Sequence, residues 1–366
     1  MTETLRWLVL AESPSTDKAA ADRCARLLAA EWRRRGARVE FLRQKQHGDQ
    51  VRAAWGTGSG GQVLVLGHYD TVHASGTLRT MPFRVARGRA YGPGTFDMKA
   101  GLVQALFAVD ALRETGAEVR GRVVFLWTSD EETGSQAARA VIEREARRSD
   151  AVLVLEPAMG PKGLLKTSRK AAGEMELLVR GRAAHAGIEP EKGVNAVHEL
   201  ALQIARMVRW NGRGNGKARG FAVHANIMEG GTRANVIAEQ ARAVLDLRAT
   251  RAQDMRTLEK RLRALRPILP GTRLELRGGF SRPPLERKMS AALYARAREL
   301  AREIGVELGE CSSGGGSDGN LTAALGVQTL DGLGAVGGGA HSANEHVILR
   351  TMPERAALLA ALLISI

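Results

Sequence analysis

Side chains that can bind a divalent cation or move a proton occur where apolar runs end and in glycine-rich turns. They are His68, Asp70, Asp97, Glu131, Glu132, Glu156 and His341. The first two follow VLVLG, the glutamate pair follows VVFLW, and the third glutamate follows VLVL. Two imidazoles together with carboxylates form a mixed nitrogen and oxygen ligand set, which suits zinc. These residue types predict a site for two divalent ions that share one bridging carboxylate.

The stretch TSDEETGS, residues 128–135, places three acidic side chains in a row at the end of an apolar run. Carboxylates at a buried strand end are costly unless a cation compensates their charge. We therefore expect one glutamate of this stretch to bind metal and its neighbour to act as a base. Asp70 stands two residues after His68, where it can accept the second imidazole N–H and fix the tautomer.

Each of these residues also has an ordinary structural explanation. His68 would be a hydrogen-bonded core histidine, Asp97 a helix N-cap, and the glutamate pair first-turn acids favoured by the helix dipole. Their joint occurrence at the ends of several apolar runs favours the metal site over these separate explanations.

The elements that position these side chains alternate between strands and helices. Residues 16–35 predict an amphipathic helix, because apolar residues recur at i, i+3 and i+4 after an Asp/Ser/Thr-rich lead. The glycine-rich turn GTGSGG then precedes QVLVLGHYD, which is typical of a central parallel strand. Strands at RGRVVFLWTSDEE and DAVLVLEP alternate with helices at KAGLVQALFAVDALRETG and SQAARAVIEREARR. This alternation predicts an α/β domain with helices covering its sheet, and ligands gather at the carboxyl ends of such strands.

From about Gly173 the pattern changes to that of a smaller α+β unit, with helices at VNAVHELALQIARMV and MRTLEKRLRAL. The α/β pattern returns at MSAALYARARELAREIG. We therefore predict a discontinuous catalytic domain, residues 1–170 and 281–366, that contains an inserted domain, residues 171–280.

Composition excludes several classes of function. The chain has 366 residues, is 44% hydrophobic, and carries 54 Lys and Arg against 39 Asp and Glu, a net charge of +15. The basic excess is spread along helical segments and aromatic residues make up 4%, so we expect no nucleic-acid partner. The two cysteines, Cys24 and Cys311, lie far apart and favour a reducing compartment. No apolar run approaches the roughly 20 residues of a membrane span, so we expect a cytoplasmic protein without a membrane partner.

The motifs together resemble a known family. The runs GHYDTVHASGTL, YGPGTFDMKAG, TSDEETGS, VLEPA, GRAAHAG, ANVI and GGGSDGNLTAALG are similar to those of the co-catalytic zinc hydrolases. This family includes carboxypeptidase G (glutamate carboxypeptidase), acetylornithine and succinyl-diaminopimelate deacylases, and aminotripeptidase. The resemblance covers nearly the whole chain in the right order, and PFRVARGRAYGPG and the GGGSD loop are most similar to carboxypeptidase G-like enzymes.

The resemblance implies a role for each residue. Asp97 would bridge two zinc ions, His68 and Glu156 would complete one site, and Glu132 and His341 the other. Glu131 would be the general base, and Asp70, which we also count among the catalytic residues, would orient His68. Cobalt or manganese are alternatives to zinc. The implied fold is a three-layer α/β/α zinc-exopeptidase domain with an inserted α+β lid and dimerisation domain.

The resemblance also assigns residues of the inserted domain. His185, in RAAHAG, would reach the active site of the partner subunit and stabilise the tetrahedral oxyanion. Asn235, Arg248 and Arg282 would hold the substrate, since the planar fork of arginine suits a carboxylate. An ordinary alternative for Arg248 is a solvated or salt-bridged strand residue.

Two features depart from the family pattern. Relatives commonly carry proline at the position of His73, which we interpret as a surface or loop residue and not as an extra ligand. The glycine run GAVGGGAH before His341 is unusually dense, which indicates close backbone approach or mobility near the metals.

The sequence thus predicts a homodimeric dinuclear zinc metallo-carboxypeptidase that removes a C-terminal amino acid, glutamate favoured, from a small peptide or N-acyl conjugate. One alternative is an N-acyl amino-acid deacylase of the acetylornithine type, with the same ligands and base. Another is a noncatalytic dimeric binding protein.

Overall fold

The computed structural model of the chain describes residues 1–56, 60–211 and 220–366. It divides into two compact units. Unit 1 comprises Met1–Ser168, Glu286–Ser313 and Ser317–Ile366, and unit 2 comprises Arg169–Leu285 and Gly314–Gly316. The predicted turn GTGSGG covers residues 56–61, and 57–59 lie outside the described residues.

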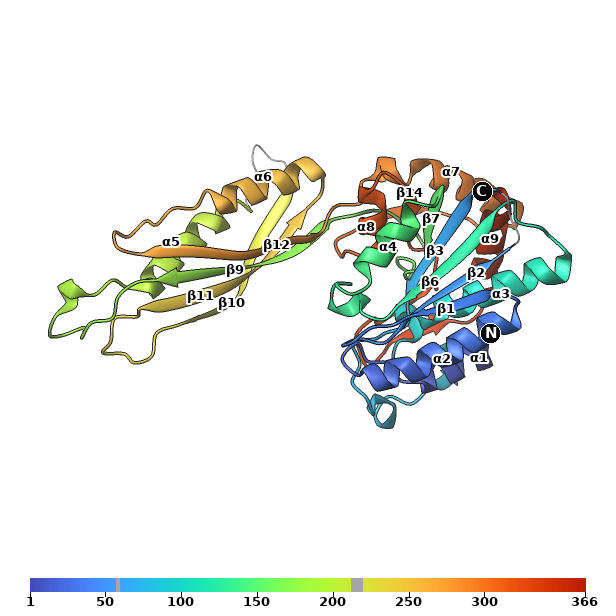
Figure 1. Cartoon of the computed structure of the whole chain (residues 1–366), viewed down its shortest axis with the longest axis horizontal. Helices are drawn as coiled ribbons and strands as arrows, with labels where there is room; N and C mark the ends of the chain where they lie inside the picture. The colour runs from blue at the N-terminus through green and yellow to red at the C-terminus, as the bar shows by residue number, and fades with distance from the viewer. Residues whose placement is uncertain (57–59, 212–219) are drawn as a thin grey trace. The chain divides into compact units, whose positions relative to one another are not determined.

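Unit 1 contains most of the helices and strands (Figure 1). Its helices are α1 (Thr2–Leu10), α2 (Lys18–Arg34), α3 (Ala100–Thr115), α4 (Arg139–Ala146), α7 (Ala291–Glu303), α8 (Asp318–Ala324) and α9 (Thr351–Ser365). Its strands are β1 (Arg38–Leu42), β2 (Gln50–Trp55), β3 (Gln62–His68), β4 (Arg84–Ala86), β5 (Arg89–Tyr91), β6 (Arg122–Thr128), β7 (Ala151–Val154), β8 (Leu165–Arg169), whose last residue belongs to unit 2, β13 (Glu310–Ser313), β14 (Gln328–Leu330), β15 (Gly337–Gly338) and β16 (His346–Ile348). Short helical turns lie at Thr77–Arg79, Thr95–Lys99, Glu131–Thr133 and Arg287–Met289.

The main sheet of unit 1 has the strand order β1-β2-β6-β3-β7-β14. β3 pairs in parallel with both β6 and β7, and β14 pairs in parallel with β7. β2 runs antiparallel to β6 and to β1 at the other edge. The prediction of a central parallel strand at QVLVLGH is therefore confirmed, within a mixed sheet. The carboxyl ends of β3, β6 and β7 meet at one edge of this sheet.

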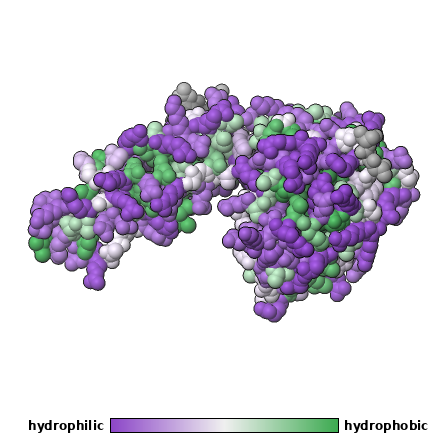
Figure 2. Space-filling model, in the orientation of Figure 1, coloured by the Kyte–Doolittle hydropathy of each residue, from purple (hydrophilic) through white to green (hydrophobic). Residues whose placement is uncertain are grey.

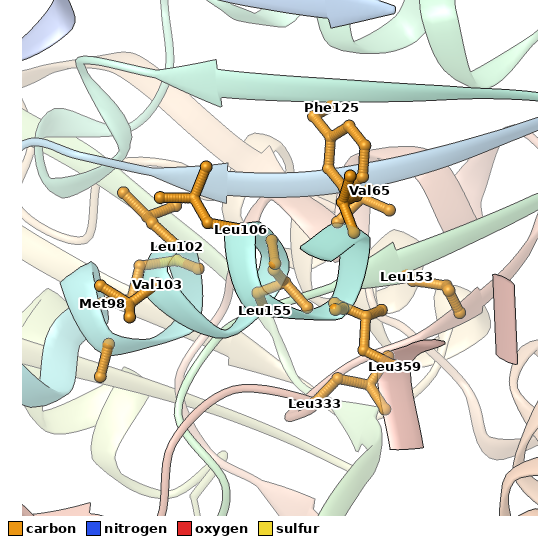
Figure 3. Close-up of a cluster of buried hydrophobic side chains, with 14 of the residues drawn as sticks. Val65, Met98, Leu102, Val103, Leu106, Phe125, Leu153, Leu155, Leu333 and Leu359 are labelled. Atoms are coloured by element: carbon orange, nitrogen blue, oxygen red, sulfur yellow. The ribbon is translucent and has the colours of Figure 1, made fainter. Parts of the chain in front are cut away.

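Both faces of the main sheet are buried under helices, which confirms the predicted three-layer α/β/α architecture. Along β3, Val63 and Val65 pack into the core beneath α1, α2, α3 and α9, while Leu64 and Leu66 pack against α4 and α8. Figure 1 shows α4 and α8 on the opposite side of the sheet from α3 and α9. Figure 3 shows the α3 side, where Leu102, Val103 and Leu106 meet strand residues such as Phe125 and Leu153. The near-continuous apolar runs of these strands follow from burial on both faces.

Helix α2 illustrates how the sequence specifies one of these layers. Asp17 caps the helix by accepting a hydrogen bond from Ala20 N at 3.0 Å. Its fully buried stripe includes Cys24, Leu28 and Trp32, which are four residues apart. The Trp32 ring stacks on Phe125 with centroids 4.0 Å apart. The predicted helix at 16–35 is thereby confirmed.

Two small sheets flank the main sheet of unit 1. One has the order β15-β16-β5-β4, and the other pairs β13 with β8. The first sheet brings the 84–91 hairpin beside the segment that follows His341. It thus links the loop that contains Asp97 to the C-terminal part of the chain.

Unit 2 is an antiparallel sheet with two helices. Its elements are β9 (Ala171–Arg180), α5 (Ala196–Val208), β10 (Phe221–Gly230), β11 (Gln240–Ala249), α6 (Ala252–Arg263) and β12 (Arg273–Arg282), with a helical turn at Pro190–Lys192. The strand order is β10-β11-β9-β12. Alternate residues of β11, such as Leu245 and Leu247, are fully buried against α5 and α6. This period of two is typical of a sheet covered on one face.

Across the described residues, the structure contains no helix with both the length and the apolar character that a membrane crossing requires.

Candidate metal centre

His68 is the last residue of β3 and is 1% exposed. Its Nδ1 atom lies 3.0 Å from the carbonyl oxygen of Asp70 and 3.3 Å from Asp70 Oδ1. Its Nε2 atom lies 3.2 Å from Asp97 Oδ1 and 3.6 Å from Glu156 Oε1, so both ring nitrogens face oxygen acceptors. When a cation replaces the proton on Nε2, Nδ1–H can still donate to Asp70.

Asp97 lies between the two candidate histidines. Its Oδ1 faces Nε2 of His68, and its Oδ2 lies 3.5 Å from Nε2 of His341. The same nitrogen of His341 lies 3.2 Å from the Glu132 carboxylate. The arrangement is therefore two histidine–carboxylate pairs, one on each oxygen of a shared aspartate.

The donor atoms of these residues form compact groups. One atom each from His68, Glu131 and Glu156 lie within 4.8 Å of one another, and so do atoms from His68, Asp97 and Glu132. These groups alone do not decide which of the two adjacent glutamates binds metal. The contact with His341 distinguishes them, because it involves Glu132. The two groups have His68 in common, and their imidazole nitrogens and carboxylate oxygens are of the types that bind divalent ions such as zinc.

The charges in the site perturb one another strongly. Burial lowers the pKa of His68, but hydrogen bonds with Asp70, Asp97 and Glu156 raise it well above its ordinary value. Hydrogen bonds with Asp97 and Glu132 raise the pKa of His341 to about 10. Burial alone would raise the pKa of Asp97, yet His341 and His68 hold it below its usual range. Burial raises the pKa of Glu132. A cluster of carboxylates that holds protons on both imidazoles is a strong attractor for cations.

Asp70 has more contacts than the sequence indicated. Its carboxylate, 0% exposed, accepts hydrogen bonds from the backbone N–H groups of Glu131 at 3.4 Å and Glu132 at 3.3 Å. Ser15 Oγ donates to it at 2.7 Å. Asp70 thus connects the His68 imidazole to the turn that contains both glutamates. Sequence reasoning missed Ser15, which has no distinguishing motif around it.

Two motifs that are far apart in the sequence meet behind the glutamate turn. Ser135, from TSDEETGS, hydrogen-bonds with Asp318, from the GGGSD loop. Thr128 Oγ1 lies 3.4 Å from the same aspartate. Ser317, which caps α8, donates to Asp331 at 2.5 Å. These buried polar contacts fix the glutamate turn against α8.

The loop before His341 has the close backbone approach that its glycine run indicated. A Cβ atom at Gly337 would lie 2.0 Å from the carbonyl oxygen of His346. His341 itself has φ of 61°, an uncommon left-handed conformation for a residue other than glycine. The surrounding loop must hold this backbone in place.

Lys166 was not singled out by the sequence. Its Nζ lies 4.0 Å from Glu156 Oε2, and the side chain is 10% exposed. It lies on β8 in the run LLKTSRK, where nothing in the residue pattern indicates a site.

Two of the predicted residues in unit 2 are neighbours. His185 pairs with Val236 in a β-bridge, and Ala186 N donates to the carbonyl oxygen of Asn235 at 3.0 Å. His185 Nδ1 accepts hydrogen bonds from Gly187 N at 3.2 Å and Ile188 N at 3.1 Å. With Nδ1 accepting, the proton of the neutral ring lies on Nε2, which is available as a donor at the exposed surface of unit 2.

The two predicted arginines differ in their surroundings. Arg248, on β11, makes a bidentate pair with Asp246, with Nε and Nη2 contacts of 3.0 Å and 2.8 Å. Arg282 ends β12 and is 8% exposed. A Cβ at Gly316 would lie 3.1 Å from its Cδ, so Gly316 packs against it. Arg248 therefore has the salt bridge that was its ordinary alternative.

Known proteins resemble this chain in sequence. The family described as Peptidase family M20/M25/M40 matches residues 64–365. Carboxypeptidase G2 of Pseudomonas sp. (strain RS-16) is 32% identical over 320 residues, which cover 84% of this chain and 75% of that protein. Succinyl-diaminopimelate desuccinylase of Ectopseudomonas mendocina (strain ymp) is 29% identical over 331 residues, 86% of each chain.

Solved structures resemble the chain in fold. Aminopeptidase PepT from Bacillus cereus ATCC 10987 has a TM-score of 0.81 at 22% identity, covering 99% of this chain and 98% of that one. The M20 family metallo-carboxypeptidase Sso-CP2 from Sulfolobus solfataricus has a TM-score of 0.74 at 18% identity, with the same coverage. Three observations lead to the same family: the geometry of the site, the family match over most of the chain, and the relative at 32% identity. The chain is therefore a metallohydrolase that belongs to peptidase family M20/M25/M40.

Proposed function

We propose that this chain is a dinuclear-metal carboxypeptidase that hydrolyses the amide bond to a C-terminal amino acid, with glutamate favoured. The observation that supports it best is the Asp97 carboxylate, whose oxygens lie 3.2 Å and 3.5 Å from Nε2 of His68 and His341. The 32% identity to carboxypeptidase G2 supports the substrate class.

The proposed metal ligands follow from the two histidine–carboxylate pairs. Asp97 would bind both ions, His68 and Glu156 the first, and Glu132 and His341 the second. Zinc suits this ligand set, with cobalt and manganese as alternatives. When bound, the ions supply Lewis acidity, which polarises the amide carbonyl and makes water a better nucleophile at neutral pH.

Glu131 is the proposed general base. It is 8% exposed and lies in the same compact group as His68 and Glu156. Its carboxylate would accept a proton from the attacking water and deliver that proton to the leaving amine nitrogen. Asp70 would position this base and the His68 ligand together, since its carboxylate contacts both segments.

His185 is the proposed oxyanion donor. The backbone N–H groups that bond to Nδ1 leave Nε2–H as the donor, as stabilisation of a developing negative charge requires. We propose that unit 2 contains the predicted inserted lid and dimerisation domain, residues 171–280, and that His185 serves the active site of the partner subunit.

The substrate carboxylate would be held by unit 2. Asn235 is adjacent to His185, and Arg282 packs against Gly316. Arg248 would contribute only by exchanging its Asp246 partner for the substrate. A planar guanidinium that forms two parallel hydrogen bonds would favour a second carboxylate, such as that of glutamate.

The homodimer is proposed to form along β10. Among the described residues, no strand pairs with the outer edge of this strand. Ile227 and Met228 on it are 50% and 59% exposed. On α5, Leu202 and Val208 are 41% and 61% exposed. An open strand edge with apolar neighbours is suited to pairing with a second copy.

A deacylase is the second candidate, because several succinyl-diaminopimelate desuccinylases are 27% to 30% identical to this chain. The same ligands and base would then cleave an N-acyl group from an amino acid. The two candidates differ in which side of the amide bond the enzyme recognises.

The test is hydrolysis of C-terminal glutamyl peptides, other dipeptides, N-acetylornithine and N-succinyl-diaminopimelate, before and after chelation and with zinc or cobalt restored. Metal-dependent release with a preference for C-terminal glutamate supports the carboxypeptidase. Preference for N-acyl substrates supports the deacylase instead. No hydrolysis of any substrate by protein with two bound metals per chain would contradict both.

A further inference from the structure

His73, the residue that departs from the family pattern, has a buried partner. It lies in the loop after β3, and its side chain is 14% exposed. Its Nε2 atom lies 2.9 Å from Oε2 of Glu345, a residue 272 positions away in the sequence. Its role is therefore in a contact between two loops and not at the open surface.

Glu345 is 0% exposed, and its carboxylate is surrounded by donors. Oε2 accepts a hydrogen bond from Gly94 N at 2.9 Å in addition to the His73 contact. Oε1 accepts from Phe96 N at 2.8 Å and from Asp97 N at 2.9 Å. Each oxygen thus has two donors, and three of the four are backbone N–H groups that cannot rotate away.

The segments joined by Glu345 are the ones that contain proposed metal ligands. His73 follows the segment of His68, and the backbone donors belong to the loop of Asp97. Glu345 itself is four residues after His341, with its N–H donating to Ser342 O at 3.1 Å. One carboxylate therefore connects the backbone of the Asp97 loop, the side chain of His73 in the loop after His68, and the segment that follows His341.

We propose that Glu345 is a positioning residue that sets the separation of the two metal ligand pairs, and that His73 supplies its fourth donor. The proposal rests on the proposed function, since it takes His68, Asp97 and His341 as metal ligands. Glu345 acts through the loops and touches neither substrate nor metal. Substituting residues that hold metal ligands in place, without binding the metal themselves, typically lowers metal affinity by about 10–100-fold.

An isosteric substitution tests the carboxylate itself. Glu345→Gln replaces one carboxylate oxygen by an NH₂ group. That NH₂ group would then face two N–H donors and could accept a hydrogen bond from neither. If that group takes the Oε1 position, Phe96 N and Asp97 N both lose their acceptor. If it takes the Oε2 position, His73 can adapt by changing tautomer but Gly94 N cannot. Either orientation shifts the loop that contains Asp97.

The chain offers a matched control in unit 2. Glu199 is also 0% exposed and accepts hydrogen bonds from Ile268 N, Leu269 N and Gln203 Nε2 at distances between 2.6 Å and 3.1 Å. Glu199→Gln disturbs a buried carboxylate with a similar set of donors but no proposed metal ligand nearby. This control variant distinguishes a general loss of folding stability from a specific effect on the positions of the proposed metal ligands.

The experiment is a zinc titration of the metal-free full-length chain against a chromophoric chelator, with cobalt absorption spectra as a second readout. We expect Glu345→Gln to weaken zinc affinity by about 10–100-fold and to change the cobalt spectrum. Glu199→Gln should leave both unchanged. Asp97→Asn serves as the reference that removes the proposed shared ligand.

His73 variants keep the test decisive if Glu345→Gln does not fold. His73→Leu removes the donor and should weaken zinc affinity, by less than Glu345→Gln does. His73→Gln keeps an N–H donor at similar reach and should restore most of the affinity. This rescue would not be expected of a residue that only fills space.

Two results would overturn the proposal, and they are distinguishable. If Asp97→Asn abolishes zinc binding while Glu345→Gln or His73→Leu binds like wild type, the inference fails and the proposed function stands. If Asp97→Asn binds zinc like wild type, the proposed metal site fails and the inference fails with it.

Discussion

The two units of the molecule use charge in different ways. Unit 2 contains 22 Lys and Arg and 11 Asp and Glu, so it accounts for 11 of the net charge of +15. Among its described residues, the buried charged side chains are Arg169, Glu199 and Arg282. Unit 1 is nearly neutral, yet it buries His68, Asp70, Glu131, Glu156 and Glu345 in one region.

This difference distinguishes the proposed metal site in unit 1 from unit 2, whose charges lie mostly at the surface. A buried charge is costly unless a partner offsets it, so a connected group of buried acids and imidazoles marks a site built for a cation. Charges at the surface stay solvated and contribute little to stability. Figure 2 shows a largely hydrophilic visible surface on both units, which hides the difference between their interiors. Substitutions in the two units should therefore have separable effects.

The largest effect should come from the proposed base in unit 1. We expect Glu131→Gln to lower kcat by about 10²–10⁴-fold, because general acid–base catalysis supplies a factor of that size. Zinc content should stay at the wild-type value. Steady-state kinetics and metal analysis of the same preparation measure both quantities. Wild-type turnover would contradict the assignment of the base.

A somewhat smaller effect is expected from unit 2. His185→Ala should lower kcat by about 10²–10³-fold, as the loss of one oxyanion donor does. Metal content should again be unchanged, because no proposed ligand lies in that unit. Kinetics on the purified variant check the size of the loss.

Mixing the two variants sharpens the comparison between the units. A mixed dimer of Glu131→Gln and His185→Ala chains has one site with both groups intact only if His185 acts across the dimer. We expect the mixture to recover activity after subunit exchange, up to one quarter of wild type in a random mixture of dimers. Absence of recovery after verified exchange would place His185 in the site of its own chain.

Core truncation in unit 2 should affect stability and leave the metal site intact. Leu245 is 0% exposed, and Leu245→Ala should lower the free energy of unfolding by about 2–5 kcal/mol. Ile268→Ala, at a side chain that is 45% exposed, is the control and should change it by less than about 0.5 kcal/mol. Chemical denaturation and zinc titration measure the two effects. A loss of zinc affinity in folded Leu245→Ala would show that the units are coupled.

The smallest expected effect is that of salt on self-association. If dimers form along β10, two units with like charge approach each other, and screening relieves their repulsion as the Debye length falls from about 10 Å at 0.1 M to about 3 Å at 1 M. We expect the Kd of the dimer to fall as sodium chloride is raised, as sedimentation velocity can show. A Kd that rises with salt would favour an interface held by opposite charges.

Much of the main fold was predictable from the sequence, because strands buried on both faces have continuous apolar runs. The run that becomes β3 ends at His68, and those that become β6 and β7 are followed within four residues by Glu131, Glu132 and Glu156. The antiparallel strands β1 and β2 were not predicted, since RVEFL and QVRAAW are short and contain charges. The small sheet of β4, β5, β15 and β16 was also missed, because strands of two or three residues have no measurable period.

The candidate metal ligands were visible because their types and places are chemically specific. The residues that contact and position these ligands could not be recognised in the sequence. Glu345 looks like any acidic residue in AHSANEH, and its importance depends on backbone N–H groups some 250 positions away. Ser15 and Lys166 likewise became candidates only through their contacts with Asp70 and Glu156 in the folded chain. Among these residues, only His73 differed visibly from the family pattern, and its contact with Glu345 could not be predicted from the sequence.

The insertion of unit 2 between Glu156 and His341 has a consequence for synthesis. A ribosome adds about 5–20 residues per second, so His341, the proposed ligand that completes the second pair, emerges roughly 10–40 s after Glu156. During that interval the nascent chain lacks both His341 and the carboxylate of Glu345. A hydrolase whose proposed site closes only around such a late segment would stay inactive until that segment has been synthesised.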